Sequence, residues 1–231
     1  MLVAGVSLSR PSIAQTEPSK SSGELVCDRI VDDFRKSKVG DFPVGWRTKD
    51  EDDMPLAKSK QLYVVEKDGK RNVLRARARD EAVTIGKSIK GWDLDAYPVL
   101  RWEWKAVELP KGGNEDSLAK NDCAASVYAF WDIGFPFYVD SVKYSWSTSL
   151  KVGTELKKRL GHDYVRVMTS GAQSLGQWRT ITVDLRADYL RMFDKERASP
   201  PAGIAILTDA DATESTAEAY YANFRLCRYK T

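Results

Sequence analysis

The chain has 231 residues, of which 42% are hydrophobic and 30% are charged, and its net charge is +3. This length is enough for one large domain with a sizeable core, and the composition is that of a folded protein rather than a disordered one. Because the acidic and basic residues are interspersed, the sequence lacks the clustered basic face of a nucleic-acid-binding protein, and we expect no such partner.

The N-terminal segment resembles a truncated export signal. Residues 1–8 are small and apolar, and Ser12-Ile13-Ala14 is similar to a small-residue cleavage site, although the basic start of such a signal is missing. We expect residues 1–14 to be a signal remnant, 15–24 a polar linker and 25–231 the folded domain. A periplasmic or secreted location follows, and no other apolar run approaches the length of a transmembrane segment.

Most of the remaining chain alternates between apolar and polar residues with the period of β-strands. Turn sequences such as Asp68-Gly69 and Ser170-Gly171 separate these segments. Many short strands at this spacing predict an all-β fold, a single antiparallel β-sandwich of the jelly-roll or lectin-like kind. The expected strands are residues 61–66, 73–79, 99–109, 124–131, 164–169, 178–185, 203–207 and 220–226.

Two of the expected strands alternate so regularly that the residues of each face can be assigned. In the first, Leu100, Trp102 and Trp104 share one face, and the charged residues between them share the other. In the second, Arg75 and Arg77 alternate with alanines, so each strand should have one polar face that is solvated or lines a groove.

One short packed helix is predicted near residues 184–194. Asp184 can cap its first turn, and the apolar residues that follow fall on one helical stripe. A short helical turn is also expected at residues 154–160. The stripe consists of Leu185, Tyr189, Met192 and Phe193.

The three cysteines, Cys27, Cys123 and Cys227, form no C-x-x-C pair, so neither a zinc site nor a thioredoxin-like site is indicated. Cys27 lies in the first strand region and Cys227 in the last, so they either form a disulfide or remain two buried thiols. Cys123 is either a nucleophile or a small buried hydrophobic residue.

Acidic residues follow the apolar strand at 203–207. Asp209, Asp211 and Thr213 space three side-chain oxygens as calcium loops do, so calcium is a candidate cofactor. The alternative is that both aspartates cap turns and bond loop amides. We expect them at the end of a sheet, next to the polar side of the strand that carries Glu103.

Glu103 and Asp122 are the candidate catalytic pair, because two carboxylates that flank a glycosidic bond can hydrolyse it. The alternative is that Glu103 forms cross-strand ion pairs with Arg75 or Arg77.

The aromatic segment at residues 131–138 contains Gly and Pro, so it is either an exposed binding surface or a loop folded onto the sheet. Trp102, Trp104 and Trp178 are expected in the core. The candidate ligand-binding residues are Arg75, Arg77, Trp131, Asp132, Tyr138 and Trp146.

Several stretches of the chain carry a family resemblance. They are Tyr97-Pro98-Val99-Leu100-Arg101-Trp102, Asn121-Asp122, Ser126-Val127-Tyr128, Tyr144-Ser145-Trp146, Ser170-Gly171, Gln177-Trp178-Arg179, Asp188-Tyr189, residues 208–213 and Ala219-Tyr220-Tyr221. Through them, the sequence from about Asp33 to Arg225 resembles a bacterial family known only as domain of unknown function 3047, which implies a jelly-roll-like fold but no function. The sequence departs from the family pattern at Ala210 and Ala212. Asp32-Asp33-Phe34 is also similar to the first strand of carbohydrate-binding jelly rolls.

The polar strand faces and the aromatic segment favour a non-catalytic binding protein of the cell envelope, with a carbohydrate or a similar polar ligand as its partner. The first alternative is a glycan-cleaving enzyme that uses the carboxylate pair. The second alternative is a scaffold that binds protein.

Overall fold

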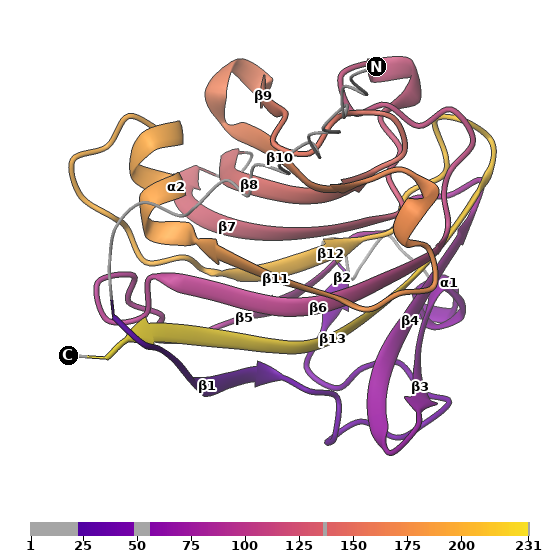
Figure 1. The fold of residues 1–231 in the computed structure, drawn as a ribbon, viewed down its shortest axis with the longest axis horizontal. Coiled ribbons are helices and arrows are strands. Elements are labelled where there is room, and N and C mark those ends of the chain that lie inside the picture. The colour runs from indigo at the N-terminus through magenta and orange to yellow at the C-terminus, as the bar shows by residue number, and fades with distance from the viewer. Residues whose placement is uncertain (1–22, 49–55, 136–137, 231) are drawn as a thin grey trace, which may run out of the picture.

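The computed structural model describes residues 23–48, 56–135 and 138–230, and in these the protein is a sandwich of two β-sheets (Figure 1). The predicted all-β sandwich is confirmed. The expected signal remnant at 1–14 and most of the linker at 15–24 lie outside the described residues, and the first strand begins at Leu25. No helix in the described ranges is long and apolar enough to cross a membrane.

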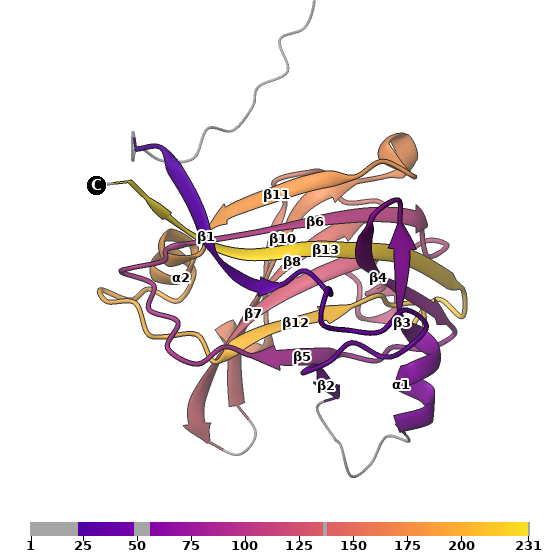
Figure 2. The ribbon, with the colours of Figure 1, turned by 90° about the horizontal axis from the view of Figure 1, so that it is seen from below.

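The first layer is a six-stranded sheet in which every pairing is antiparallel. Figure 2 shows β1 running beside β13, so the two ends of the domain lie side by side. In order, the sheet contains β11 (Arg179–Asp184), β6 (Val99–Glu108), β13 (Thr216–Tyr229), β4 (Arg71–Arg79) and β3 (Tyr63–Asp68), with β1 (Leu25–Asp32) also paired to β13.

The second layer is a seven-stranded sheet, and it contains one parallel pair, β8 with β10. Every other pairing described in this sheet is antiparallel, so this pair is a local exception within the predicted antiparallel sandwich. In order, the sheet contains β2 (Arg47–Thr48), β5 (Ile85–Ser88), β12 (Gly203–Leu207), β7 (Ala125–Phe135), β8 (Tyr138–Ser147), β10 (Asp163–Ser170) and β9 (Glu155–Lys158).

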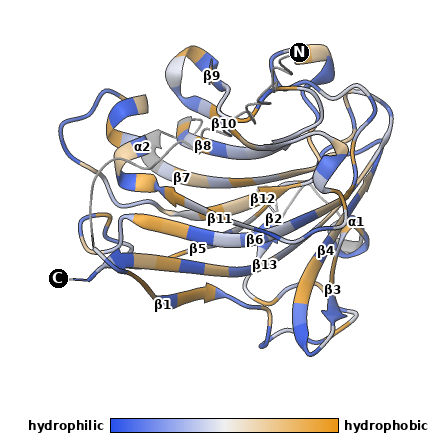
Figure 3. Ribbon diagram, in the orientation of Figure 1, coloured by the Kyte–Doolittle hydropathy of each residue, from blue (hydrophilic) through white to orange (hydrophobic). Residues whose placement is uncertain are grey.

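The core fills the space between the sheets. Trp102 of β6 lies 5.6 Å from Tyr144 of β8 between ring centroids, and Trp104 lies 6.2 Å from Trp146. The alternation predicted for β6 is confirmed, since Arg101 is exposed while Trp102 and its even-numbered neighbours are buried. Figure 3 shows hydrophilic and apolar segments following one another along β6 and β13.

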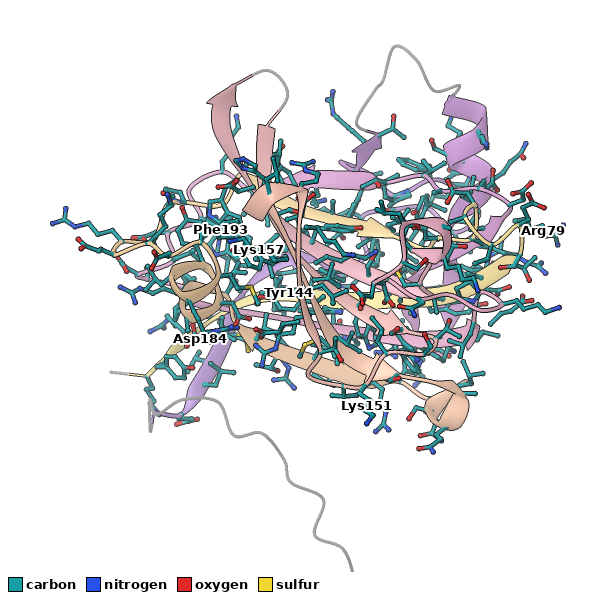
Figure 4. All side chains as sticks on the ribbon, turned by 90° about the horizontal axis from the view of Figure 1, so that it is seen from above. Arg79, Tyr144, Lys151, Lys157, Asp184 and Phe193 are labelled. Atoms are coloured by element: carbon teal, nitrogen blue, oxygen red, sulfur yellow. A yellow bond between two sulfur atoms is a disulfide. The ribbon has the colours of Figure 1, made fainter. Side chains whose placement is uncertain are left out.

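The predicted helix is present as α2 (Leu185–Met192), and Asp184 caps it by accepting a hydrogen bond from the Ala187 amide at 2.9 Å. Its apolar stripe packs on Trp131, whose ring centroid lies 4.6 Å from that of Tyr189. Figure 4 shows Asp184 and Phe193 on this helix at one end of the molecule, with Arg79 at the opposite end.

Local structure differs from the prediction in two places. A helix, α1 (Leu56–Leu62), covers the start of the expected strand at 61–66, so β3 begins only at Tyr63. The expected helical turn at 154–160 is instead the edge strand β9 followed by the 3-10 turn η2 (Arg159–Gly161). Further 3-10 turns are η1 (Leu118–Lys120) and η3 (Ala172–Ser174).

Of the two alternatives for Cys27 and Cys227, the structure contains the disulfide. Cys27 of β1 is bonded to Cys227 of β13, 200 residues away in the sequence. The bond ties the first strand of the domain to the last, and Cys123 is a buried free thiol.

Candidate functional site

The outer face of the seven-stranded sheet carries aromatic side chains on its central strand. Val127, Ala129 and Trp131 of β7 point into the core and are buried. Because successive strand residues point to opposite faces, Tyr128 and Phe130 lie on the outer face, where both remain partly exposed.

These two aromatics belong to two adjacent cross-strand rows, and residues directly opposite one another on paired strands share a face. One row runs Gly86, Ala205, Tyr128, Lys143 across β5, β12, β7 and β8. The next runs Ser88, Gly203, Phe130, Ser141, Asp163 and reaches β10.

Small residues beside the aromatics open a groove along these rows. Its volume is about 570 Å³. A Cβ added at Gly86 would lie 3.8 Å from the Ala205 Cβ and 3.9 Å from Phe130 Cε1, so larger side chains at these positions would fill the floor. The lining also includes Val139 of β8 and Arg47 and Thr48 of β2. Figure 2 shows the hairpin of β7 and β8 projecting from the body on the same side as β2.

The rim of the groove carries charged side chains in ion pairs. Lys87 Nζ lies 2.8 Å from Asp32 Oδ2, and Arg159 Nε lies 2.8 Å from Asp163 Oδ2. Ser141 Oγ donates to Asp163 Oδ1 at 2.7 Å. These pairs fix polar groups around an aromatic floor.

A cluster of three carboxylates lies where β12 ends and β7 begins. One oxygen each of Asp122, Asp209 and Asp211 falls within 4.8 Å of the others. Asp122 accepts hydrogen bonds from the Ala212 amide at 3.1 Å and the Thr213 amide at 2.8 Å. The sequence placed Thr213 among the calcium ligands, and its hydroxyl donates to Asp122 Oδ2 at 2.5 Å.

Asp209 carries a buried carboxyl oxygen that has no hydrogen-bond partner. It is 5% exposed, and its Oδ1 atom meets no hydrogen-bond donor. Burial, reinforced by the charges of Asp122 and Asp211 and opposed by that of Lys143, raises the pKa of Asp209 to about 7.

Lys143 links this cluster to the groove. It is buried, and its Nζ lies 5.6 Å from the centroid of the Tyr128 ring. Burial acts to lower the pKa of Lys143, but the surrounding acidic groups, first Cys123 and Tyr128 and then Asp209 and Glu115, outweigh it and hold that pKa well above its usual range. The ammonium group therefore stays charged beside the groove floor.

The charged residues that were predicted to form a polar strand face, Glu103, Arg75 and Arg77, lie on the six-stranded sheet and not on the sheet that carries the groove. Glu103 points outward from β6, where its carboxylate lies 2.5 Å from Arg71 Nη1 and 2.7 Å from Asn223 Nδ2. The expected pairing of Glu103 with Arg75 or Arg77 is wrong, because Arg75 lies 3.1 Å from Glu66 and Arg77 lies 3.2 Å from Glu218.

Glu103 and Asp122 do not form a facing pair. Asp122 is buried at the start of the seven-stranded sheet and bonds the 212–213 backbone, whereas Glu103 lies on the outer face of the six-stranded sheet. For the same reason, the prediction that Asp209 and Asp211 lie next to the polar side of β6 is wrong.

The predicted aromatic surface is also rearranged. Trp131 and Trp146 are buried in the core, so a ligand on the surface cannot stack on either ring. Trp178, expected in the core, instead lies half-buried on the outer face of the six-stranded sheet, with Arg71 4.3 Å from its ring centroid. The side chains of Asp132 and Tyr138 lie outside what the structure describes, although their backbones belong to β7 and β8.

Comparison with protein families gives one match. Residues 45–225 fit the family described as "Protein of unknown function (DUF3047)". The chain belongs to the DUF3047 family. No curated protein matches it.

Solved structures similar to this DUF3047 protein include the family 11 carbohydrate-binding module of the cellulosomal cellulase Lic26A-Cel5E of Clostridium thermocellum. The TM-score is 0.42 at 11% identity, covering 89% of this chain and 95% of that one. Another is endoglucanase 3 of Trichoderma harzianum, from family GH12, with a TM-score of 0.41 at 9% identity, covering 92% of this chain and all (100%) of that one. These values are too low to carry a function from those proteins to this DUF3047 member.

Sequence reasoning missed Tyr128 and Phe130 of this DUF3047 protein as groove residues. Both faces of β7 carry aromatics, so the segment reads as one apolar run rather than as two faces. The usable signal was the period of two, which separates Tyr128 and Phe130 from the buried Trp131.

Cys123 of this DUF3047 protein should be chemically inert. Burial raises the pKa of its thiol to about 12, so almost no thiolate is present near neutral pH. We expect iodoacetamide at about pH 8 to leave Cys123 unmodified in the native protein and to alkylate it in denaturant, as read by intact mass. Rapid alkylation of the native protein would contradict the buried position.

Proposed function

We propose that this protein binds a glycan or a similar polar chain molecule in the groove on the outer face of the seven-stranded sheet, without cleaving it, in the cell envelope. The observation that carries the proposal is the pair of cross-strand rows with Tyr128 and Phe130 on the floor and ion-paired groups on the rim. Ligand sites commonly combine an aromatic lining with a few fixed polar groups.

Sugar rings match this lining chemically. A pyranose has C–H groups on its faces, which pack on aromatic rings, and hydroxyl groups around its edge, which need hydrogen-bond partners. Tyr128 and Phe130 offer the rings, while Ser141 and Asp163 offer polar atoms at one side of the floor. An amphipathic surface of this kind suits a glycan better than a purely apolar ligand.

The dimensions of the groove suit a short chain rather than one sugar. The second row crosses five strands, from β5 to β10. Four strand spacings of about 4.8 Å span about 19 Å, which is room for several linked rings.

The carboxyl groups of the groove bear on whether the ligand is cleaved. Glycoside hydrolysis needs two carboxyl groups on either side of the scissile bond. Among the described lining residues only Asp163 carries a carboxylate, and it is occupied by Arg159 and Ser141.

The disulfide supports the proposed location. Disulfides persist in oxidising compartments such as the periplasm and the exterior of the cell. The bond between Cys27 and Cys227 is therefore consistent with a periplasmic or secreted protein, as the N-terminal sequence predicts.

A glycan array probed with the purified, oxidised full chain tests the proposal. We expect binding above background to a set of related glycans and no release of shorter products from them. An array that stays at background while circular dichroism shows an intact β fold would overturn glycan binding. Product release would replace the binding function by the hydrolytic one.

A further inference from the structure

The carboxylate cluster is assembled by backbone contacts between segments far apart in the sequence. The Asp209 amide donates to the Cys123 carbonyl at 3.1 Å, which places the end of β12 beside the start of β7. The 212–213 amides bond Asp122 and close the loop over it. The fold therefore holds Asp122, Asp209 and Asp211 together whatever occupies the space between them.

Asp209 leaves one buried oxygen atom of the cluster without a partner. The residue is 5% exposed, and its Oδ1 atom accepts no hydrogen bond. A buried acceptor without a partner destabilises a folded protein, and a charged one does so more strongly. Native structures satisfy such groups with a proton, a water molecule or an ion.

The local charge favours a cation. Three carboxylates meet within 4.8 Å, and carboxylates this close repel one another unless a positive charge intervenes. Lys143 supplies one positive charge near Asp209, which leaves the group with an excess of negative charge.

We propose that Asp122, Asp209 and Asp211 bind a divalent cation of the calcium type. Calcium takes carboxylate oxygens at 2.3–2.6 Å in flexible geometry, so any two ligands of one ion lie no more than about 5 Å apart. The three oxygens of the cluster lie within 4.8 Å of one another and meet this limit. The amide bonds to Asp122 do not prevent this, because each carboxylate oxygen has two lone pairs.

This site differs from the one expected from sequence in its third ligand. The structure puts Asp122, from a distant segment, where the sequence placed Thr213, and the Thr213 hydroxyl orients Asp122 instead. The inference does not depend on glycan binding, since it concerns the stability of the folded chain.

The test is the thermal stability of the full chain after dialysis against chelator, with calcium chloride or magnesium chloride as separate probes. At a calcium concentration 100-fold above Kd we expect a rise in Tm of about 5–10 °C, which saturates with one ion bound per chain by titration calorimetry. Asp209→Asn, which keeps the shape of the side chain, should abolish the shift. Asp116→Asn, which changes an exposed carboxylate outside the cluster, should retain it.

The contrary results are distinct. A calcium shift below about 1 °C in the parent protein, or an equal shift in the parent and in Asp209→Asn, would overturn the proposal. A shift with magnesium alone would overturn the assignment to calcium. If Asp209→Asn instead stabilises the metal-free protein and calcium has no effect, a proton shared between Asp209 and Asp211 fills the role that we assign to the cation.

Discussion

Replacing Asp188 with alanine should lower the stability of the domain by about 2–3 kcal/mol, because it leaves the buried Tyr144 hydroxyl without its acceptor and removes one of the two carboxylates that bind Arg166 and Arg191. Asp188, on α2, is 4% exposed. Its carboxylate accepts hydrogen bonds from Arg166 at 2.9 Å, from Arg191 at 3.0 Å and from the Tyr144 hydroxyl at 2.8 Å. The network attaches α2 to β8 and β10, so its loss weakens the end of the sandwich where the helix packs.

Thermal denaturation measures this effect, and for a domain of this size we expect Tm to fall by about 5–10 °C. Tyr144→Phe removes one hydrogen bond and should cost about 1 kcal/mol. Glu24→Ala is the matched control: its ion pair with Lys230 is largely exposed, so the change should stay below about 1 kcal/mol. An Asp188→Ala protein that melts with the parent would contradict the network.

Removing the disulfide is the second large expected effect. Because Cys27 and Cys227 are 200 residues apart, their bond restrains almost the whole unfolded chain. The double variant Cys27→Ser, Cys227→Ser should lose about 2–5 kcal/mol. Dithiothreitol should lower the Tm of the parent protein to a similar value.

The reductant also provides the control for this prediction. It should leave the double serine variant unchanged, because the remaining cysteine, Cys123, is a free thiol. A parent protein with the same Tm in oxidising and reducing buffer would show that the bond is absent or contributes nothing.

The sequence predicts the parts of the fold that depend on local pattern. The alternation around Trp102 and Trp104 identifies the buried face of β6, because that strand has one apolar and one charged face. Asp184 and the apolar stripe after it predict α2, because a cap and a helical period act within a few residues.

The partners of the charged residues could not be predicted, since they depend on strand order and register. Arg75 of β4 lies directly opposite Tyr220 of β13, and Tyr220 lies directly opposite Lys105 of β6. This register places Arg75 in the row of Lys105 and not in that of Glu103. The register of β13 shifts between Ala222 and Arg225, where Asn223 has a positive φ of 52°. At this shift the side-chain amide of Asn223 donates a hydrogen bond to the Glu103 carboxylate.

The groove depends on contacts that are distant in sequence. Gly86, Ala205 and Tyr128 come from three strands, and only their pairing shows that two small residues lie beside an aromatic ring. The Gly and Pro of the segment at 131–138 predict either an exposed binding surface or a loop folded onto the sheet, yet β7 extends to Phe135 and β8 begins at Tyr138. The parallel pairing of β8 with β10 has no local sequence signature.

The affinity of groove variants for the strongest array ligand tests the central claim most directly. We expect Tyr128→Ala and Phe130→Ala each to weaken Kd at least about tenfold, or about 1.4 kcal/mol, because each removes a ring from the floor. Tyr220→Ala, a matched aromatic change on the outer face of the other sheet, should leave Kd unchanged while circular dichroism shows that all three proteins are folded. Unchanged Kd in both groove variants, or loss of binding in Tyr220→Ala alone, would contradict the assignment of the groove as the binding site.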